Sequence, residues 1–120
     1  MEKINIVNTS YMAIPGLIPG TYIRGNGVNI QTIIGIVSNE FGVTEKEMKS
    51  VHRYRRFVEA RMTAMFLIRK HTSYSLFEIG KIFGGRDHTT VLYSMRTVYD
   101  LIDSETNFKN RLLLIENKLA

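Results

Sequence analysis

Apolar side chains recur at intervals of three and four residues through most of the chain after residue 28. This spacing places them along one face of an α-helix. The first run ends at Gly42, a residue type that commonly terminates helices. We therefore predict a helix from about residue 30 to Gly42, with these apolar positions: Ile30, Ile33, Ile34, Val37 and Phe41.

Three further segments carry sequence signals that are typical of helices. Residues 44–47 have the spacing of a capping box, which predicts about one turn of helix. A long helix is predicted from about Phe57 to Lys70, and its apolar positions are broad enough for nearly full burial: Val58, Met62, Ala64, Met65, Leu67 and Ile68. A C-terminal amphipathic helix is predicted to close the bundle through Phe108, Leu112, Ile115 and Leu119.

The glycine pair Gly84-Gly85 separates two further predicted helices. Ser75 to Glu78 has capping-box spacing and begins a short helix with Leu76, Ile79 and Phe83 on one face. After the turn, Asp87 is a favourable N-cap for a second helix with one apolar face: Val91, Met95, Val98 and Ile102. Two helices joined this way make a helix-turn-helix. The predicted fold is therefore all-α, a bundle of about six helices that contains a helix-turn-helix.

Residues 1–28 do not follow the helical pattern. They hold both prolines and the turn-favouring pairs Pro15-Gly16, Pro19-Gly20 and Asn26-Gly27. The segment is nevertheless too apolar for a solvated linker, and it could lie as a strap across the bundle or pair as short strands. We predict an irregular N-terminal extension at 1–28 and a single domain at 29–120. The apolar extension also suggests a protein partner.

Basic residues are concentrated in the middle of the chain, whose net charge is +5. Residues 49–96 contain ten Lys or Arg and three acidic residues, which gives 10 − 3 = +7, so the remainder sums to 5 − 7 = −2. A basic centre is typical of proteins that contact a phosphate backbone. The chain has no cysteine, no signal-peptide pattern and no apolar run long enough for a membrane span. We expect a soluble, cytoplasmic protein without metal, cofactor or nucleotide.

The N-terminal end of the second motif helix carries polar side chains suited to base edges. Such a helix meets the major groove with this end, which here presents Arg86, Asp87, His88, Thr89 and Thr90. A carboxylate accepts from the exocyclic amine of cytosine or adenine, and threonine methyl groups suit the thymine methyl. Asp87 is equally suited to capping the helix, and the two roles can coexist. The sequence thus predicts a protein that recognises double-stranded DNA.

Residues 30–119, about three-quarters of the chain, resemble the C-terminal DNA-binding domain of the bacterial replication initiator DnaA. The resemblance rests on the long-helix segment Glu59–Met65, on Ser75–Gly80, and above all on Phe83-Gly84-Gly85-Arg86-Asp87-His88-Thr89-Thr90-Val91-Leu92. It implies recognition of a short, asymmetric, A/T-rich duplex box in replication initiation or its regulation.

The resemblance also implies roles for individual residues. Asp87, Thr89 and Thr90 lie at the family's base-contacting positions, and His88 lies at a position that donates to a base acceptor or to phosphate. Arg53 lies in the basic loop at the position that enters the adjacent minor groove, where narrow A/T-rich segments concentrate negative potential. The remaining expected contacts are to the DNA backbone: Arg61, Arg69 and Lys70 by charge, Arg86 to phosphate or else to a neighbouring acid, and Leu76 and Phe77 through their amides, with their side chains packed inward.

The sequence lacks the features that an enzyme of this lineage would need. No G-x-x-x-x-G-K-[ST] phosphate loop occurs, so we expect a stand-alone DNA-binding domain without the ATPase module. The acidic residues of the basic centre are scattered over separate predicted helices, which disfavours a Mg²⁺-dependent nuclease. Two other classes stay open: a transcriptional regulator or phage or mobile-element accessory of the same fold, and a protein-interaction module that has lost DNA affinity.

Overall fold

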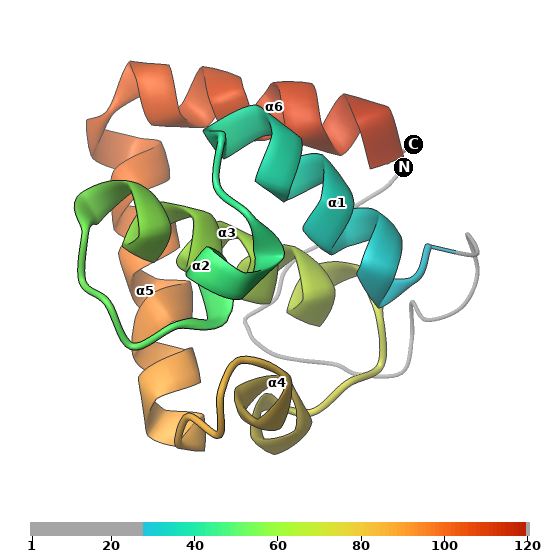
Figure 1. The fold of residues 1–120 in the computed structure, drawn as a ribbon. Coiled ribbons are helices and arrows are strands. Elements are labelled where there is room, and N and C mark those ends of the chain that lie inside the picture. Colours follow the sequence, from blue (N-terminus) through green and yellow to red (C-terminus); the bar gives the residue numbers. More distant parts are fainter. Residues whose placement is uncertain (1–27, 120) are drawn as a thin grey trace.

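The computed structural model describes residues 28–119, and these residues form six α-helices (Figure 1). The predicted N-terminal extension lies outside the described residues except for Val28. The helices are α1 (Ile30–Phe41), α2 (Glu45–Lys49), α3 (Arg55–His71), α4 (Leu76–Ile82), α5 (His88–Ser104) and α6 (Thr106–Leu119). The prediction of an all-α bundle of about six helices with a helix-turn-helix is confirmed.

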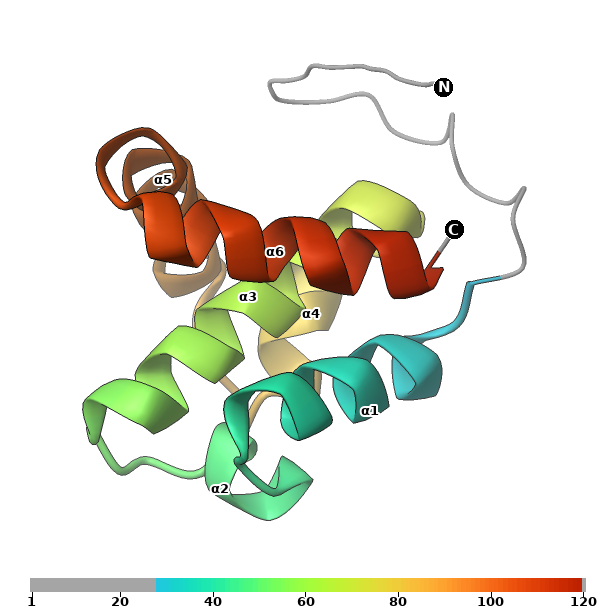
Figure 2. The same cartoon turned by 90° about the horizontal axis from the view of Figure 1, so that it is seen from above.

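Helix α3 is the centre of the bundle. It packs against α1 on one side and α5 on the other, while α6 spans α1 and α5, and α4 packs mainly on α5. Figure 2 shows α6 crossing over α3, with α1 and α5 on opposite sides. Every residue of α3 from Ala60 to Ile68 is buried, including the predicted apolar positions in that range, while Val58 is only partly buried. The predicted apolar faces of α1 and α6 are likewise buried, with Ile30 only partly so.

The predicted helix ends are confirmed where a local signal exists. Gly42 ends α1 in the left-handed conformation, with φ of 65°. Thr44 and Ser75 both form complete capping boxes, with Glu47 and Glu78 respectively. Helix α3 begins at Arg55 rather than near Phe57, where the apolar pattern starts. The extra residues are exposed, so no hydrophobic periodicity marks them.

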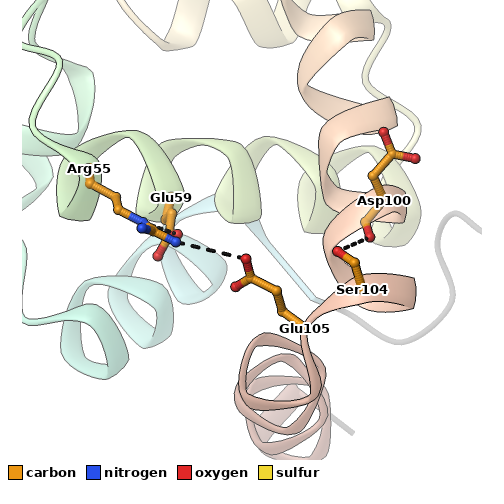
Figure 3. Close-up of polar contacts among 5 residues, drawn as sticks. All are labelled: Arg55, Glu59, Asp100, Ser104 and Glu105. Carbon is orange, nitrogen blue, oxygen red and sulfur yellow. Dashed lines mark hydrogen bonds and ion pairs between the residues drawn. The ribbon is translucent and has the colours of Figure 1, made fainter.

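Arg55, in the first turn of α3, lies near two acidic side chains (Figure 3). Arg55 Nε donates to Glu59 Oε2 one turn further along α3, at 3.0 Å. Arg55 Nη2 also lies 3.9 Å from Glu105 Oε2, at the α5–α6 junction, where Ser104 Oγ donates to the carbonyl of Asp100 at 2.8 Å. Because Arg55 is largely exposed, these pairs contribute little stability. They do direct this arginine toward the protein.

A second polar contact joins α3 to α6. Lys70 Nζ lies 2.5 Å from Glu116 Oε2, and His71 Nε2 lies 2.7 Å from Glu116 Oε1. Burial raises the pKa of Glu116, but hydrogen bonds from His71 and Lys70 and the charge of Lys70 outweigh it, so that the pKa falls to about 2. His71 is itself partly buried. This carboxylate stabilises the folded state wherever it is ionised.

The Glu116 contact predicts a defined dependence of stability on pH. A folded-state pKa below the unfolded value of 4.5 stabilises the protein above pH 4.5, and this contribution disappears as the pH falls toward 2. The loss attributable to Glu116 is at most about 3 kcal/mol. Urea unfolding at pH values across this window should show a shallower decline for Glu116→Gln than for the wild type. Equal declines would contradict the assignment.

Candidate nucleic-acid interface

The turn between α4 and α5 depends on three glycines. Gly84 and Gly85 have φ of 82° and 75°, in the left-handed region that favours glycine. Gly80, inside α4, has a different reason: a Cβ there would lie 2.0 Å from the carbonyl oxygen of Arg86. The turn folds back so closely that Arg86 N donates to Gly80 O at 2.8 Å. These contacts fix the direction in which α5 leaves the turn.

Asp87 caps α5, as the sequence predicts. Its Oδ2 accepts from the Thr89 amide at 3.1 Å and also from the Thr89 hydroxyl. Its Oδ1 lies 3.5 Å from His88 Nδ1, and both side chains are more than half exposed. One carboxylate oxygen therefore completes the helix, while the other faces the surface. The predicted contact of Asp87 with a base stays a prediction.

The first turn of α5 presents Asp87, His88, Thr89 and Thr90 together at the surface. Because the Thr89 hydroxyl donates to Asp87, its methyl group is left for an apolar contact. Further along α5, Val91, Met95 and Val98 turn inward and are buried. The opposite face of the helix is exposed, with Tyr93 69% accessible. Helix α5 thus packs into the core along one face and presents polar side chains to the surface at its N-terminal end.

The loop between α2 and α3 is the second exposed basic element. Arg53 is exposed there, as is Arg56 in the first turn of α3, and Val51 is 86% accessible. Arg53 forms no ion pair with any residue of the described part of the chain. In Figure 1 this loop and the start of α5 lie on the same side of the molecule, away from α6. The structure therefore brings Arg53 to the side that carries the polar end of α5.

Arg61 does not project from α3 as expected of a backbone anchor. Its side chain is buried, with 6% of the residue accessible. Nε donates to the Met48 carbonyl at 2.7 Å, and Nη2 donates to the carbonyls of Ser50 and His52 at 2.8 and 3.1 Å. Burial, followed by the charges of Arg86 and Arg53, lowers the pKa of Arg61 to about 10. It is therefore still protonated at neutral pH.

Arg86 contacts the same loop from the helix-turn-helix. Nη2 donates to the Ser50 carbonyl at 2.6 Å, while Nη1 donates to the carbonyl of Phe83 and, at 3.4 Å, to that of Lys49. The sequence suggested phosphate or an acid as its partner, and the structure shows backbone carbonyls instead. Partial burial lowers the pKa of this guanidinium. No sequence pattern could have identified these acceptors, because every residue has a carbonyl.

The other predicted backbone contacts occupy the α3–α4 connection. Arg69 Nη1 donates to the Tyr74 carbonyl at 3.0 Å, and Lys70 is paired with Glu116. Leu76 is partly buried, as expected of a packed side chain. Phe77 is 59% accessible, contrary to that expectation, and Lys81 Nζ lies 4.7 Å from its ring centroid. Whether the amides of Leu76 and Phe77 bind phosphate stays a prediction.

Two other kinds of feature are absent from residues 28–119. No group of three or more His, Cys, Asp or Glu residues there could hold a metal ion. None of the helices in this range is both long and apolar enough to cross a membrane. The polar end of α5 and the α2–α3 loop are thus the features that call for an explanation.

Comparison with known proteins identifies the family. The family model described as "Bacterial dnaA protein helix-turn-helix" matches residues 30–98. A chromosomal replication initiator protein DnaA from Streptococcus pyogenes serotype M1 is 40% identical over 92 residues, which are 77% of this chain and 20% of the relative. The protein of that name from Chloroflexus aurantiacus (strain ATCC 29366 / DSM 635 / J-10-fl) is 32% identical over 96 residues, 80% of this chain. The chain spans about a fifth of the length of these relatives. It belongs to the bacterial DnaA helix-turn-helix family.

Proposed function

We propose that this protein binds double-stranded DNA at a specific sequence. In this proposal the N-terminal end of α5 enters the major groove, and Arg53 of the α2–α3 loop enters the adjacent minor groove. The supporting observation is that Asp87, His88, Thr89 and Thr90 are exposed together at the start of α5, on the same side of the molecule as the α2–α3 loop (Figure 1). Carboxylate, imidazole and threonine groups can distinguish base pairs in the major groove.

The charge distribution supports DNA as the partner. Arg53 in the α2–α3 loop and Arg56 in the first turn of α3 are exposed, while the acidic residues Glu59 and Glu105 both lie near Arg55 (Figure 3). Since relatives of this family are named chromosomal replication initiators, we infer that the preferred site is a short A/T-rich box of the replication-origin kind. In this role the protein would act in replication initiation or its regulation.

Selection of duplexes from a random pool tests this function directly. The 120-residue protein should enrich one short asymmetric motif, and its affinity for that motif should fall steeply as the salt concentration rises. A scrambled duplex of the same composition is the control, since it measures binding without base recognition. Failure to enrich any motif, with no duplex binding even at low salt, would favour a protein-interaction module instead.

The minor-groove contact makes a separate prediction for Arg53→Ala. Because narrow A/T-rich grooves concentrate negative potential, we expect about a tenfold loss of affinity for boxes with A/T-rich flanks, and a much smaller loss for G/C-rich flanks. Fluorescence anisotropy with the two duplexes measures both values. Arg56→Ala removes an equal charge from the same exposed stretch, and should weaken both duplexes alike. If Arg53→Ala also lowers the affinity for both duplexes by the same factor, Arg53 does not bind the minor groove.

A further inference from the structure

We infer that Arg61 and Arg86 are positioning residues: they fasten the α2–α3 loop to the helix-turn-helix, so that Arg53 and the start of α5 meet DNA as one unit. This inference rests on the proposed function for its consequence in DNA binding. The fastening itself rests on contacts within the protein. It assigns to both arginines an indirect role in DNA binding.

The two guanidinium groups converge on one short segment of backbone. Ser50 O accepts from Arg61 Nη2 at 2.8 Å and from Arg86 Nη2 at 2.6 Å. Arg61 reaches this oxygen from α3, and Arg86 reaches it from the turn before α5. Hydrogen bonds from charged donors are stronger than those between neutral groups. A single loop carbonyl thus joins three parts of the fold that are distant in sequence.

Neighbouring carbonyls extend this attachment on both sides of Ser50. Arg61 also binds Met48 O and His52 O, and Arg86 also lies 3.4 Å from Lys49 O. These oxygens belong to the end of α2 and the loop after it, where intrahelical donors are missing. The two arginines therefore supply most of the polar contacts that a loop without regular structure needs.

The burial of Arg61 supports a structural role for its guanidinium group. Removing a guanidinium from water is costly unless its N–H groups are satisfied. Here both Nε and Nη2 find carbonyl acceptors inside the protein. Arg86 is partly buried and uses both of its terminal nitrogens on carbonyls. These bonds direct two nitrogens of each guanidinium into the protein.

Gly84 provides independent evidence that the turn before α5 packs closely against the end of α2. A Cβ at this position would lie 2.9 Å from the Lys49 carbonyl oxygen and 3.1 Å from Arg86 Nη1. Its φ of 82° also favours glycine. A side chain there would push the turn away from the loop. The absence of one allows the close approach that Arg86 then secures.

The fastening has a consequence for recognition. A loop that is free to move must become ordered when it binds DNA. The conformational entropy lost in this ordering lowers the affinity. Arg61 and Arg86 order the backbone on the N-terminal side of Arg53 before DNA arrives. The contribution of Arg53 to DNA affinity should therefore depend on Arg86, although Arg53 would contact the minor groove and Arg86 contacts carbonyls of the protein.

A double-mutant cycle tests this dependence. Arg86→Lys retains the charge, but a single ammonium cannot reproduce the planar fork that spans two carbonyls. With Arg53 present, we expect Arg86→Lys to weaken binding to an A/T-flanked box about tenfold, and in the Arg53→Ala background about twofold or less. Arg56→Ala in place of Arg53→Ala is the control, and should give additive effects. Additive effects with Arg53→Ala would overturn the coupling.

Amide hydrogen exchange of the DNA-free protein separates this inference from the proposed function. The amides of Ser50 and His52 donate to Glu47 O and Ser50 Oγ, and their exchange should accelerate about tenfold or more in Arg86→Lys, whereas exchange in α1 should not change. Faster exchange with no duplex binding in the wild type would refute the DNA-binding proposal and still support the fastening. Unchanged loop exchange, or acceleration throughout the protein, would overturn the fastening role.

Discussion

Alanine at position 80 is expected to lower the free energy of unfolding by about 3 kcal/mol, although alanine is normally the better helix former. The added Cβ would lie 2.0 Å from the Arg86 carbonyl oxygen and 3.1 Å from its carbonyl carbon, both of them backbone atoms. The neighbour cannot rotate away, so α4 or the turn must shift. The shift would also break the bond from Arg86 N to Gly80 O. Urea unfolding monitored by circular dichroism measures the loss.

Gly35→Ala is the matched control for this change. Gly35 also lies inside a helix, α1, but a Cβ there would have no atom within 4 Å outside the helix itself. Replacing it should raise the free energy of unfolding by up to about 1 kcal/mol, because glycine loses more backbone entropy on folding. Opposite signs for the two substitutions support the close packing of the turn. Stabilisation by both would contradict it.

Replacement of Asp87 by serine is expected to weaken binding to the preferred duplex by about 1 to 3 kcal/mol, the range for one lost base contact. In the wild type Oδ2 caps α5, and Oδ1 faces the surface beside His88. Serine is as good an N-cap as aspartate, but it has a single oxygen. The variant should therefore keep the cap and lose the acceptor proposed for the base. Titration of preferred and scrambled duplexes measures the difference.

Asp87→Ala separates the two roles of this residue. It should lose the base contact and also about 1 kcal/mol of folding stability, because the helix cap disappears. Asp87→Ser should unfold at nearly the same urea concentration as the wild type. If serine weakens preferred and scrambled duplexes equally, Asp87 contributes no base recognition. Its importance would then lie in the cap alone.

The sequence predicts those parts of the structure that depend on neighbouring residues. Helical periodicity identified the buried faces of α1, α5 and α6, because each face follows from residues three and four apart. The capping boxes of Thr44 and Ser75 follow from a spacing of three residues. The exposed start of α3 at Arg55 has no such signal, and the prediction began the helix late.

Contacts between distant segments explain what the sequence could not predict at the candidate site. The bonds from Arg86 to Ser50 and Lys49 span 36 and 37 residues, and their acceptors are backbone oxygens. Charge patterning alone does not distinguish an arginine that turns inward from one that faces DNA. The exposed position of Phe77 is similar, since its apolar character suggests packing that the short α4 does not provide.

The acceptors of the two arginines also determine which substitutions the α2–α3 loop tolerates. Peptide oxygens are present whatever side chains the loop carries, so Arg61 and Arg86 would grip a loop of altered sequence equally well. Val51, which is 86% accessible, is therefore suited to exchange without loss of the scaffold, whereas the Tyr54 ring also packs edge-on against the buried Phe57, with ring centroids 5.2 Å apart. Preference for flanking DNA could then be redesigned at position 51 independently of the sequence recognised by α5.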